Sequence, residues 1–257
     1  MIFELLAMAV SIVGLDDCPS SIRQDVSIEA TVLATPIDYE FLASFVEEID
    51  RLSFDGDVPE NSWEYFLWRA QSEENARISC LLKLVAQEQF LRHWYLAAQT
   101  PNTESSATQG QLISAGHVLT GIDNRNRNWL GDQLVQYGWF TISEYGEDAD
   151  VAAFLIVQHA DDDVQFQRDV LEQLRPLADT GDTKPRRYAM LIDRVAVNSG
   201  ELQIYGSQGY CAGPLSWEAR PYEGTADEMN HRRQDVGLPD HQVYVDRMSR
   251  NCSTREY

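Results

Sequence analysis

The run of residues 151–157, Val-Ala-Ala-Phe-Leu-Ile-Val, constrains the fold of this chain more than any other feature. A helix over about 147–160 that contains this run is apolar around most of its circumference, and such a helix has to be buried. The run passes directly into Gln158 and His159, and three aspartates at 161–163 are suited to begin the next helix. The sequence therefore predicts a central buried helix that ends in a histidine at the margin of the core.

Helical periodicity extends over most of the remaining chain. Apolar residues recur at helical spacing over about 37–52, 63–70, 73–99, 123–137, 164–177, 186–198 and 225–236, and a last short helix carries Tyr244. Asp123 is suited to cap the helix that it begins, either Thr225 or Asp227 is suited to cap a later one, and residues 139–146 are expected to form a connector. Only residues 202–208 alternate like a strand, which predicts half of a hairpin with residues 210–215. The predicted fold is mainly α, a helical domain with one small β-hairpin near residues 202–215.

Residues 100–110 are rich in Thr, Ser, Asn and Gln and form the best internal boundary, because such segments are loops or linkers. They separate an N-terminal helical region, 22–100, from a helical domain with the hairpin, 111–252. In addition, we expect a signal segment over residues 1–17. Residues 5–15 are apolar except for Ser11, which suits such a segment and is too short to span a bilayer.

The compartment follows from the interpretation of that N-terminal segment. Glu4 stands where a signal segment carries basic residues, whereas the abrupt change to polar residues at 16–19 favours export. We expect an exported or periplasmic protein with no membrane span in the mature chain. If residues 5–15 are instead a core helix, the protein is cytoplasmic. Export permits two disulfides, and the sequence leaves all three pairings open among Cys18, Cys80, Cys211 and Cys252.

The strongly acidic composition excludes two classes of partner. The net charge is -21, with 41 acidic residues against 20 basic ones. Nucleic acids and anionic membrane surfaces are bound by basic patches, which this balance argues against. The partner that remains is a small polar ligand or another protein.

Polar side chains interrupt the apolar segments that follow the central run. Asp193 and Arg194 lie inside an apolar helix, and adjacent helical residues diverge by about 100°, so each needs its own partner. Arg194 can clamp a carboxylate or phosphate, and Asp193 can orient His159 as a general acid or base. The structural alternative is that both residues form buried salt bridges.

The strand-like segment adds amide and phenol groups. Gln203 and Tyr205 are predicted to share one strand face, and Arg232 offers a further anion contact. The predicted catalytic residues are His159, Asp193 and Tyr205, and the predicted ligand-binding residues are Arg194, Gln203, Gln208 and Arg232. Because an unpaired polar group in an apolar setting costs several kcal/mol, we expect all of these except Arg232 to converge in space.

Several chemistries lack their sequence signatures. His159-x-Asp161-x-Asp163 has neither the glycine turn nor the terminal acid of a cation loop, and no Cys-x-x-Cys pair is present. A Gly-x-Ser-x-Gly elbow and a phosphate-binding glycine loop are also missing. We therefore predict neither a metal nor a cofactor.

The second half of the chain resembles a family of bacterial proteins known only as a domain of unknown function. The resemblance covers roughly residues 84–244. It rests on the ordered pattern Gly138-Trp139, Gln158-His159-Ala160-Asp161, Asp193-Arg194, Gln203-x-Tyr205-Gly206-Ser207-Gln208 and Arg232-Arg233. Phe140 stands where proline is usual and Ser207 where threonine is usual, and neither change removes a titratable group. The resemblance implies a domain extent and no established activity.

Two functions remain open from the sequence. The first is a ligand-binding or interaction domain built around a buried polar network. The alternative is a hydrolase that acts on a small polar or anionic substrate, with His159 as general acid or base and Arg194 as anion clamp. The sequence does not decide between a catalytic and a structural network.

Overall fold

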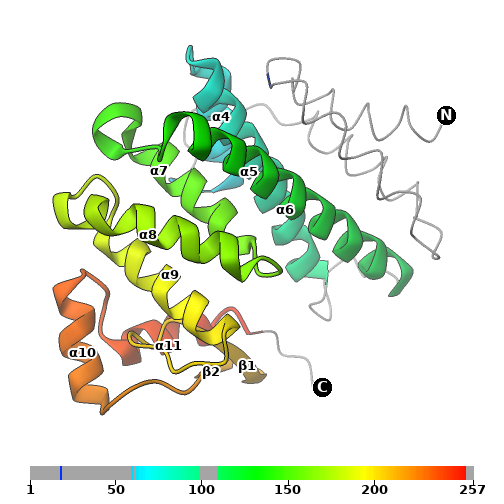
Figure 1. The fold of residues 1–257 in the computed structure, drawn as a ribbon. Helices are drawn as coiled ribbons and strands as arrows, with labels where there is room; N and C mark the ends of the chain where they lie inside the picture. The colour runs from blue at the N-terminus through cyan, green and yellow to red at the C-terminus, as the bar shows by residue number, and fades with distance from the viewer. Residues whose placement is uncertain (1–17, 19–58, 61, 99–108, 253–257) are drawn as a thin grey trace. The chain divides into compact units, whose positions relative to one another are not determined.

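The structure of the chain is a computed structural model, and it describes residues 18, 59–60, 62–98 and 109–252. These residues form eight helices and one two-stranded sheet, which confirms the prediction of a mainly α fold with a small hairpin (Figure 1). They divide into two compact units. Within the described ranges, the first unit contains residues 18, 59–60, 62–98, 109–138 and 151–156, and the second contains 139–150 and 157–252.

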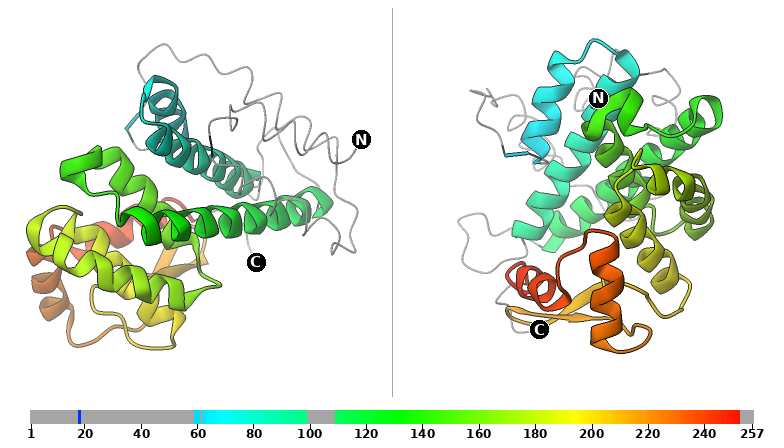
Figure 2. Two further views of the ribbon diagram at one scale, coloured as in Figure 1. Left: turned by 45° about the horizontal axis from the view of Figure 1, so that its top comes forward. Right: turned by 90° about the vertical axis from the view of Figure 1, so that its left-hand side faces the viewer.

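The first unit is built from α4 (Trp63–Ser72), α5 (Ala76–Ala98) and α6 (Gln109–Tyr137). Ser62 begins α4, because its hydroxyl accepts a hydrogen bond from the backbone N–H of Tyr65. Helix α4 packs against α5, and α5 packs against α6 (Figure 2). Leu91 of α5 forms a core cluster with Ala115 and Leu119 of α6. Helix α5 is buried along most of its length, polar residues included.

Helix α6 begins earlier than predicted. The sequence suggested that Asp123 caps a helix that starts there, whereas α6 starts at Gln109 and Asp123 lies in its middle. The prediction was wrong because Asp123 has another role: its carboxylate accepts hydrogen bonds from Arg92 of α5. The linker was predicted over residues 100–110, of which 109 and 110 begin α6 and 100–108 lie outside the described residues. The predicted signal segment, 1–17, and the predicted helix over 37–52 also lie outside the described residues.

Helix α7 (Ile142–His159) contains the apolar run from which the prediction started. Six of the seven residues of the run are buried and Leu155 is half-buried, which confirms that the run is in the core: Val151, Ala152, Ala153, Phe154, Ile156 and Val157. Residues 139–146, predicted as a connector, are already helical from Ile142. The helix bends at Gly146, whose φ of 83° is outside the helical region. Residues 151–156 of α7 belong to the first unit and its other residues to the second.

The second unit contains four further helices: α8 (Val164–Thr180), α9 (Pro185–Asn198), α10 (Ala226–Asp235) and α11 (His241–Ser249). The predicted caps are confirmed. Asp163 accepts a hydrogen bond from the N–H of Phe166 at the start of α8, and Thr225 forms a capping box with Glu228 at the start of α10. Helices α8 and α9 pack side by side (Figure 1).

The hairpin lies further along the chain than predicted. Strands β1 (Gly209–Gly213) and β2 (Ser216–Ala219) pair antiparallel, and β2 packs against α11. The strand predicted over 202–208 is wrong, because this segment turns at Gly206 with a φ of 63° and keeps only one isolated bridge, from Gln203 to Tyr222. Gln203 and Tyr205 therefore do not share a strand face.

Two disulfides fix the pairing that the sequence left open. Cys18 is bonded to Cys80 in the first unit, and Cys211 is bonded to Cys252 in the second. The second bond joins strand β1 to the residues that follow α11. No helix in the described ranges is long and apolar enough to cross a membrane.

Candidate functional site

Asp193 of α9 holds the centre of the predicted polar cluster. Its side chain is fully buried, with 0% of its surface exposed. One carboxylate oxygen accepts hydrogen bonds from the backbone N–H groups of Ile204, at 2.7 Å, and Tyr205, at 2.9 Å. The other accepts from the N–H of Ser207 at 2.8 Å. The carboxylate thus satisfies the amides of one turn, residues 204–207, and this use of the amides is what prevents the predicted strand.

The carbonyls of the 204–207 turn are held by side chains from other helices. Arg232 and Arg233 of α10 donate to the carbonyls of Ile204, at 3.1 Å, and Tyr205. The Tyr244 hydroxyl of α11 donates to the carbonyl of Ser207 at 3.0 Å. At Gly206 there is no room for a side chain, since a Cβ would lie 2.5 Å from the sulfur of Met229. The turn is therefore fixed by three helices.

Gln203 and Gln208 extend the same network through the backbone. The fully buried Gln203 amide donates to the carbonyls of Gln208, at 2.9 Å, and Arg220, at 2.6 Å, and it accepts from the N–H of Gln208 at 2.8 Å. Two of these bonds join Gln203 to Gln208 across the 204–207 turn, and the third joins Gln203 to Arg220, which follows β2. The side chain of Gln208 donates to the Ser207 hydroxyl at 3.1 Å and accepts from Arg194.

Arg194 pairs with Asp161, at the edge of the network. Its guanidinium donates through Nε, at 2.7 Å, and Nη2 to the two oxygens of Asp161, and through Nη1 to the Gln208 side chain at 3.0 Å. Burial acts to raise the pKa of Asp161, but the hydrogen bonds and charge of Arg194 outweigh it and hold that pKa below its usual value. The two side chains are 24% and 48% exposed, so this is a partly solvated ion pair.

The structure thus brings together five of the residues singled out in the sequence: Asp193, Arg194, Gln203, Gln208 and Arg232. As predicted, Asp193 and Arg194 do not pair with each other. Tyr205 takes part in the network through its backbone N–H and carbonyl. Its phenol is half-buried, and burial, followed by the charge of Asp193, raises the pKa of the phenol. The hydrogen bonds of Asp193 all go to backbone amides, so Asp193 does not orient His159, which ends α7.

A second polar group, in the first unit, was not predicted as a site from the sequence. Glu88 of α5 is buried, and its carboxylate has an oxygen within 4.8 Å of one from Asp123 of α6. Arg92 donates to both, with bonds of 3.1 and 3.0 Å to Asp123. Glu88 and Arg92 stand four residues apart inside an apolar helix face, a spacing that could have revealed the pair.

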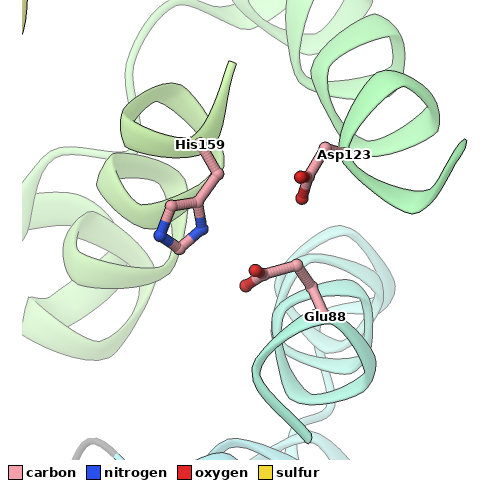
Figure 3. Close-up of side chains that lie close together, drawn as sticks. All are labelled: Glu88, Asp123 and His159. Carbon is pink, nitrogen blue, oxygen red and sulfur yellow. The ribbon is translucent and has the colours of Figure 1, made fainter. Parts of the chain in front are cut away.

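Carboxylates and imidazoles are common ligands of divalent metals. Figure 3 labels the two carboxylates of the first unit that lie close together, Glu88 on α5 and Asp123 on α6. Within the first unit, Arg92 forms an ion pair with each of these two carboxylates and so already compensates part of their negative charge. The absence of a metal therefore stays a prediction.

His241 of α11 lies against the 204–207 turn. Its ring packs edge-on against Tyr222 at a centroid distance of 5.7 Å, and a Cβ at Gly206 would lie 3.0 Å from its Nε2. Burial, followed by the positive charge of Arg233, lowers the pKa of His241 below 6.5. The Gly206 backbone and the carboxylates of Asp240 and Asp193 act in the opposite direction and are outweighed.

We expect His241 to make the protein less stable in mildly acidic solution. Its pKa is lower in the folded state than in the unfolded state, so the unfolded chain binds the proton more readily. The contribution of neutral His241 to the free energy of unfolding is fully present above about pH 6.5 and decreases as the pH falls below that value. Urea denaturation at pH 7.5 and 5.5 should show that His241→Gln loses less stability on acidification than the parent does.

The control for this measurement is His231→Gln, because His231 is exposed on α10. That variant should follow the parent at both pH values. If His241→Gln and the parent lose equal stability between pH 7.5 and 5.5, the neutral state of His241 does not contribute.

Comparison with known proteins gives the extent of a domain in this chain but no activity. A sequence model of a family of unknown function matches residues 103–253, a range that contains every predicted site residue. No curated protein and no solved structure matches the chain. The predicted resemblance to a domain of unknown function is confirmed.

Proposed function

The chain belongs to this family of unknown function, DUF6624, and on that premise we propose that it is a non-catalytic binding protein. The observation that carries the proposal is the use made of Asp193. Both of its oxygens accept backbone amides inside the core. A carboxylate occupied in this way cannot accept a proton from a substrate or position a histidine, whereas it can hold a backbone segment in one conformation.

The segment held in this way is suited to recognition. The 204–207 turn carries the half-buried side chains of Ile204 and Tyr205, while its backbone is fixed by α9, α10 and α11. A surface that is ordered before binding loses little conformational entropy when the partner arrives. Tyrosine contributes apolar area and a hydroxyl together, and it is enriched in interfaces. The partner is a small polar ligand or another protein.

The hydrolase alternative retains one observation in its favour. The neighbouring carboxylates of Glu88 and Asp123, labelled in Figure 3, are of a ligand type found in hydrolytic metal sites. Against it, the donors of Arg194 are occupied by Asp161 and Gln208, so a substrate anion would have to displace an internal carboxylate. We therefore keep binding as the proposed function and test catalysis directly.

The first experiment measures hydrolysis of chromogenic phosphate and carboxylate esters, with and without added Mn²⁺ or Zn²⁺. We expect no turnover above background from the parent protein or from His159→Ala. Turnover by the parent that His159→Ala abolishes, with an unchanged thermal melt, would establish the hydrolase in place of the binding protein.

The second experiment tests the 204–207 turn. Immobilised parent protein and the Tyr205→Ala variant are incubated with an extract of the host organism, and the retained molecules are compared. We expect a ligand that the parent retains and Tyr205→Ala loses. Tyr210→Ala is the control, because Tyr210 is an exposed tyrosine on the neighbouring hairpin. Equal retention by all three proteins contradicts recognition by the turn.

A further inference from the structure

Arg125 of α6 is a buried arginine that meets no carboxylate in the described part of the chain. Only 5% of its surface is exposed. Its Nε and Nη2 donate to the Asn126 amide oxygen at 3.3 and 3.1 Å, and Nη2 also donates to the Gln87 amide oxygen at 3.1 Å. These acceptors are neutral. Burial lowers the pKa of Arg125 to about 10, and no neighbouring negative charge offsets that effect.

Two further arginines are buried in the described part of the chain, both in the second unit, and carboxylate charges act on each. Arg187 pairs with Asp150 and Glu147. Arg233 donates to the carbonyls of Pro239 and Tyr205, and the charges of Asp193 and Asp240 act on it. A buried charge without a counter-charge is costly, so proteins pair it with another group or with a ligand. Of these three buried arginines, Arg125 is the one on which no carboxylate charge acts.

One nitrogen of Arg125 remains for such a ligand. Nη1 makes no hydrogen bond to any described residue, although it carries two N–H donors. Arg125 Nη1 has no hydrogen-bond partner but is not among the fully buried polar atoms, so part of its surface is open to solvent. Gln87 and Asn126 meanwhile hold the rest of the guanidinium in place.

We propose that Arg125 is an anion-binding residue, with Nη1 donating to an oxygen of a carboxylate or phosphate group. The anion supplies the counter-charge that the first unit lacks at this point, and it reaches a guanidinium whose orientation is already set. This site is independent of the 204–207 turn, which belongs to the second unit. Either proposal can therefore fail without the other.

The test is a thermal melt of the full chain at constant ionic strength, with sodium phosphate or sodium acetate replacing sodium chloride. We expect at least one of the two anions, at about 20 mM, to raise the melting temperature of the parent by roughly 3 °C. A response to phosphate alone identifies a phosphate site, and a response to acetate alone identifies a carboxylate site. If neither anion changes the melting temperature, the proposal is overturned.

Variants assign the response to Arg125. Arg125→Met should abolish the shift, and Arg125→Lys, which keeps the charge but loses Nη1, should bind the active anion at least fivefold more weakly in a calorimetric titration. Arg168→Met is the control, because Arg168 is an exposed arginine of α8 and should keep the full shift. If Arg125→Lys binds as tightly as the parent, the anion binds elsewhere, whether or not Arg125→Met folds.

Discussion

Asp193→Ala is expected to lower the free energy of unfolding by roughly 4 kcal/mol or more, because it leaves three backbone amides, one buried and two partly buried, without an acceptor. Hydrogen bonds to a charged acceptor contribute about 1.5–3 kcal/mol each, and the loss is smaller than their sum because the turn can relax. Urea denaturation of the variant and the parent at pH 7.5 measures the difference.

The neighbouring residue provides the control for this substitution. Arg194→Ala removes a charge at the next position of the same helix, but the ion pair it breaks is 24% and 48% exposed. The apolar sequence around Arg194 predicted a buried side chain, whereas Arg194 is partly exposed. For the partly solvated pair we expect a loss of about 1 kcal/mol. If the two substitutions cost the same, the Asp193 carboxylate is not the support of the 204–207 turn.

Removal of the Cys211–Cys252 disulfide is expected to have an effect of similar size. The bond closes a segment with a sequence separation of 41, and the chain-entropy relation gives a loss of about 4 kcal/mol for that length. The double variant Cys211→Ala/Cys252→Ala should melt well below the parent in oxidising buffer. Cys252 packs in one core cluster with Trp217 and Tyr244, so the variant loses packing as well.

Reducing agent separates the two disulfides. Added to the parent it opens both bonds, whereas added to the double variant it opens only Cys18–Cys80. The melting temperature of the double variant in oxidising buffer should therefore lie between that of the oxidised parent and that of the fully reduced parent. If it melts within about 1 °C of the parent, the Cys211–Cys252 bond adds no stability. Export of the protein stays a prediction, with which the two disulfides agree because disulfides persist in oxidising compartments.

The helices could be predicted because their signals are local. The apolar run at 151–157 is buried, and the caps at Asp163 and Thr225 act where the sequence placed them. Capping and amphipathic periodicity depend on residues within one or two turns, so they can be read from the chain alone. The wrong start of α6 has the opposite origin: Asp123 resembles a cap, but its partner Arg92 lies 31 residues away.

The hairpin position could not be predicted for a related reason. Residues 202–208 alternate like a strand, but Asp193 accepts their amides from 11 to 14 positions earlier in the chain. Periodicity contains no information about such an acceptor. Convergence of the polar residues was predictable, because buried polar groups need partners. The roles of these residues were not predictable. A carboxylate that holds backbone amides and a carboxylate that transfers protons produce the same sequence pattern.

The path of α7 affects how this chain can be altered by recombination. The first unit takes residues 109–138 and then 151–156, while the intervening 139–150 belong to the second. A single crossover between two parent genes at any peptide bond within residues 139–156 therefore gives a protein in which both units contain residues from both parents. A chimera of two family members that keeps each unit from a single parent therefore has to exchange residues 139–150 together with 157–252 and leave 151–156 in place.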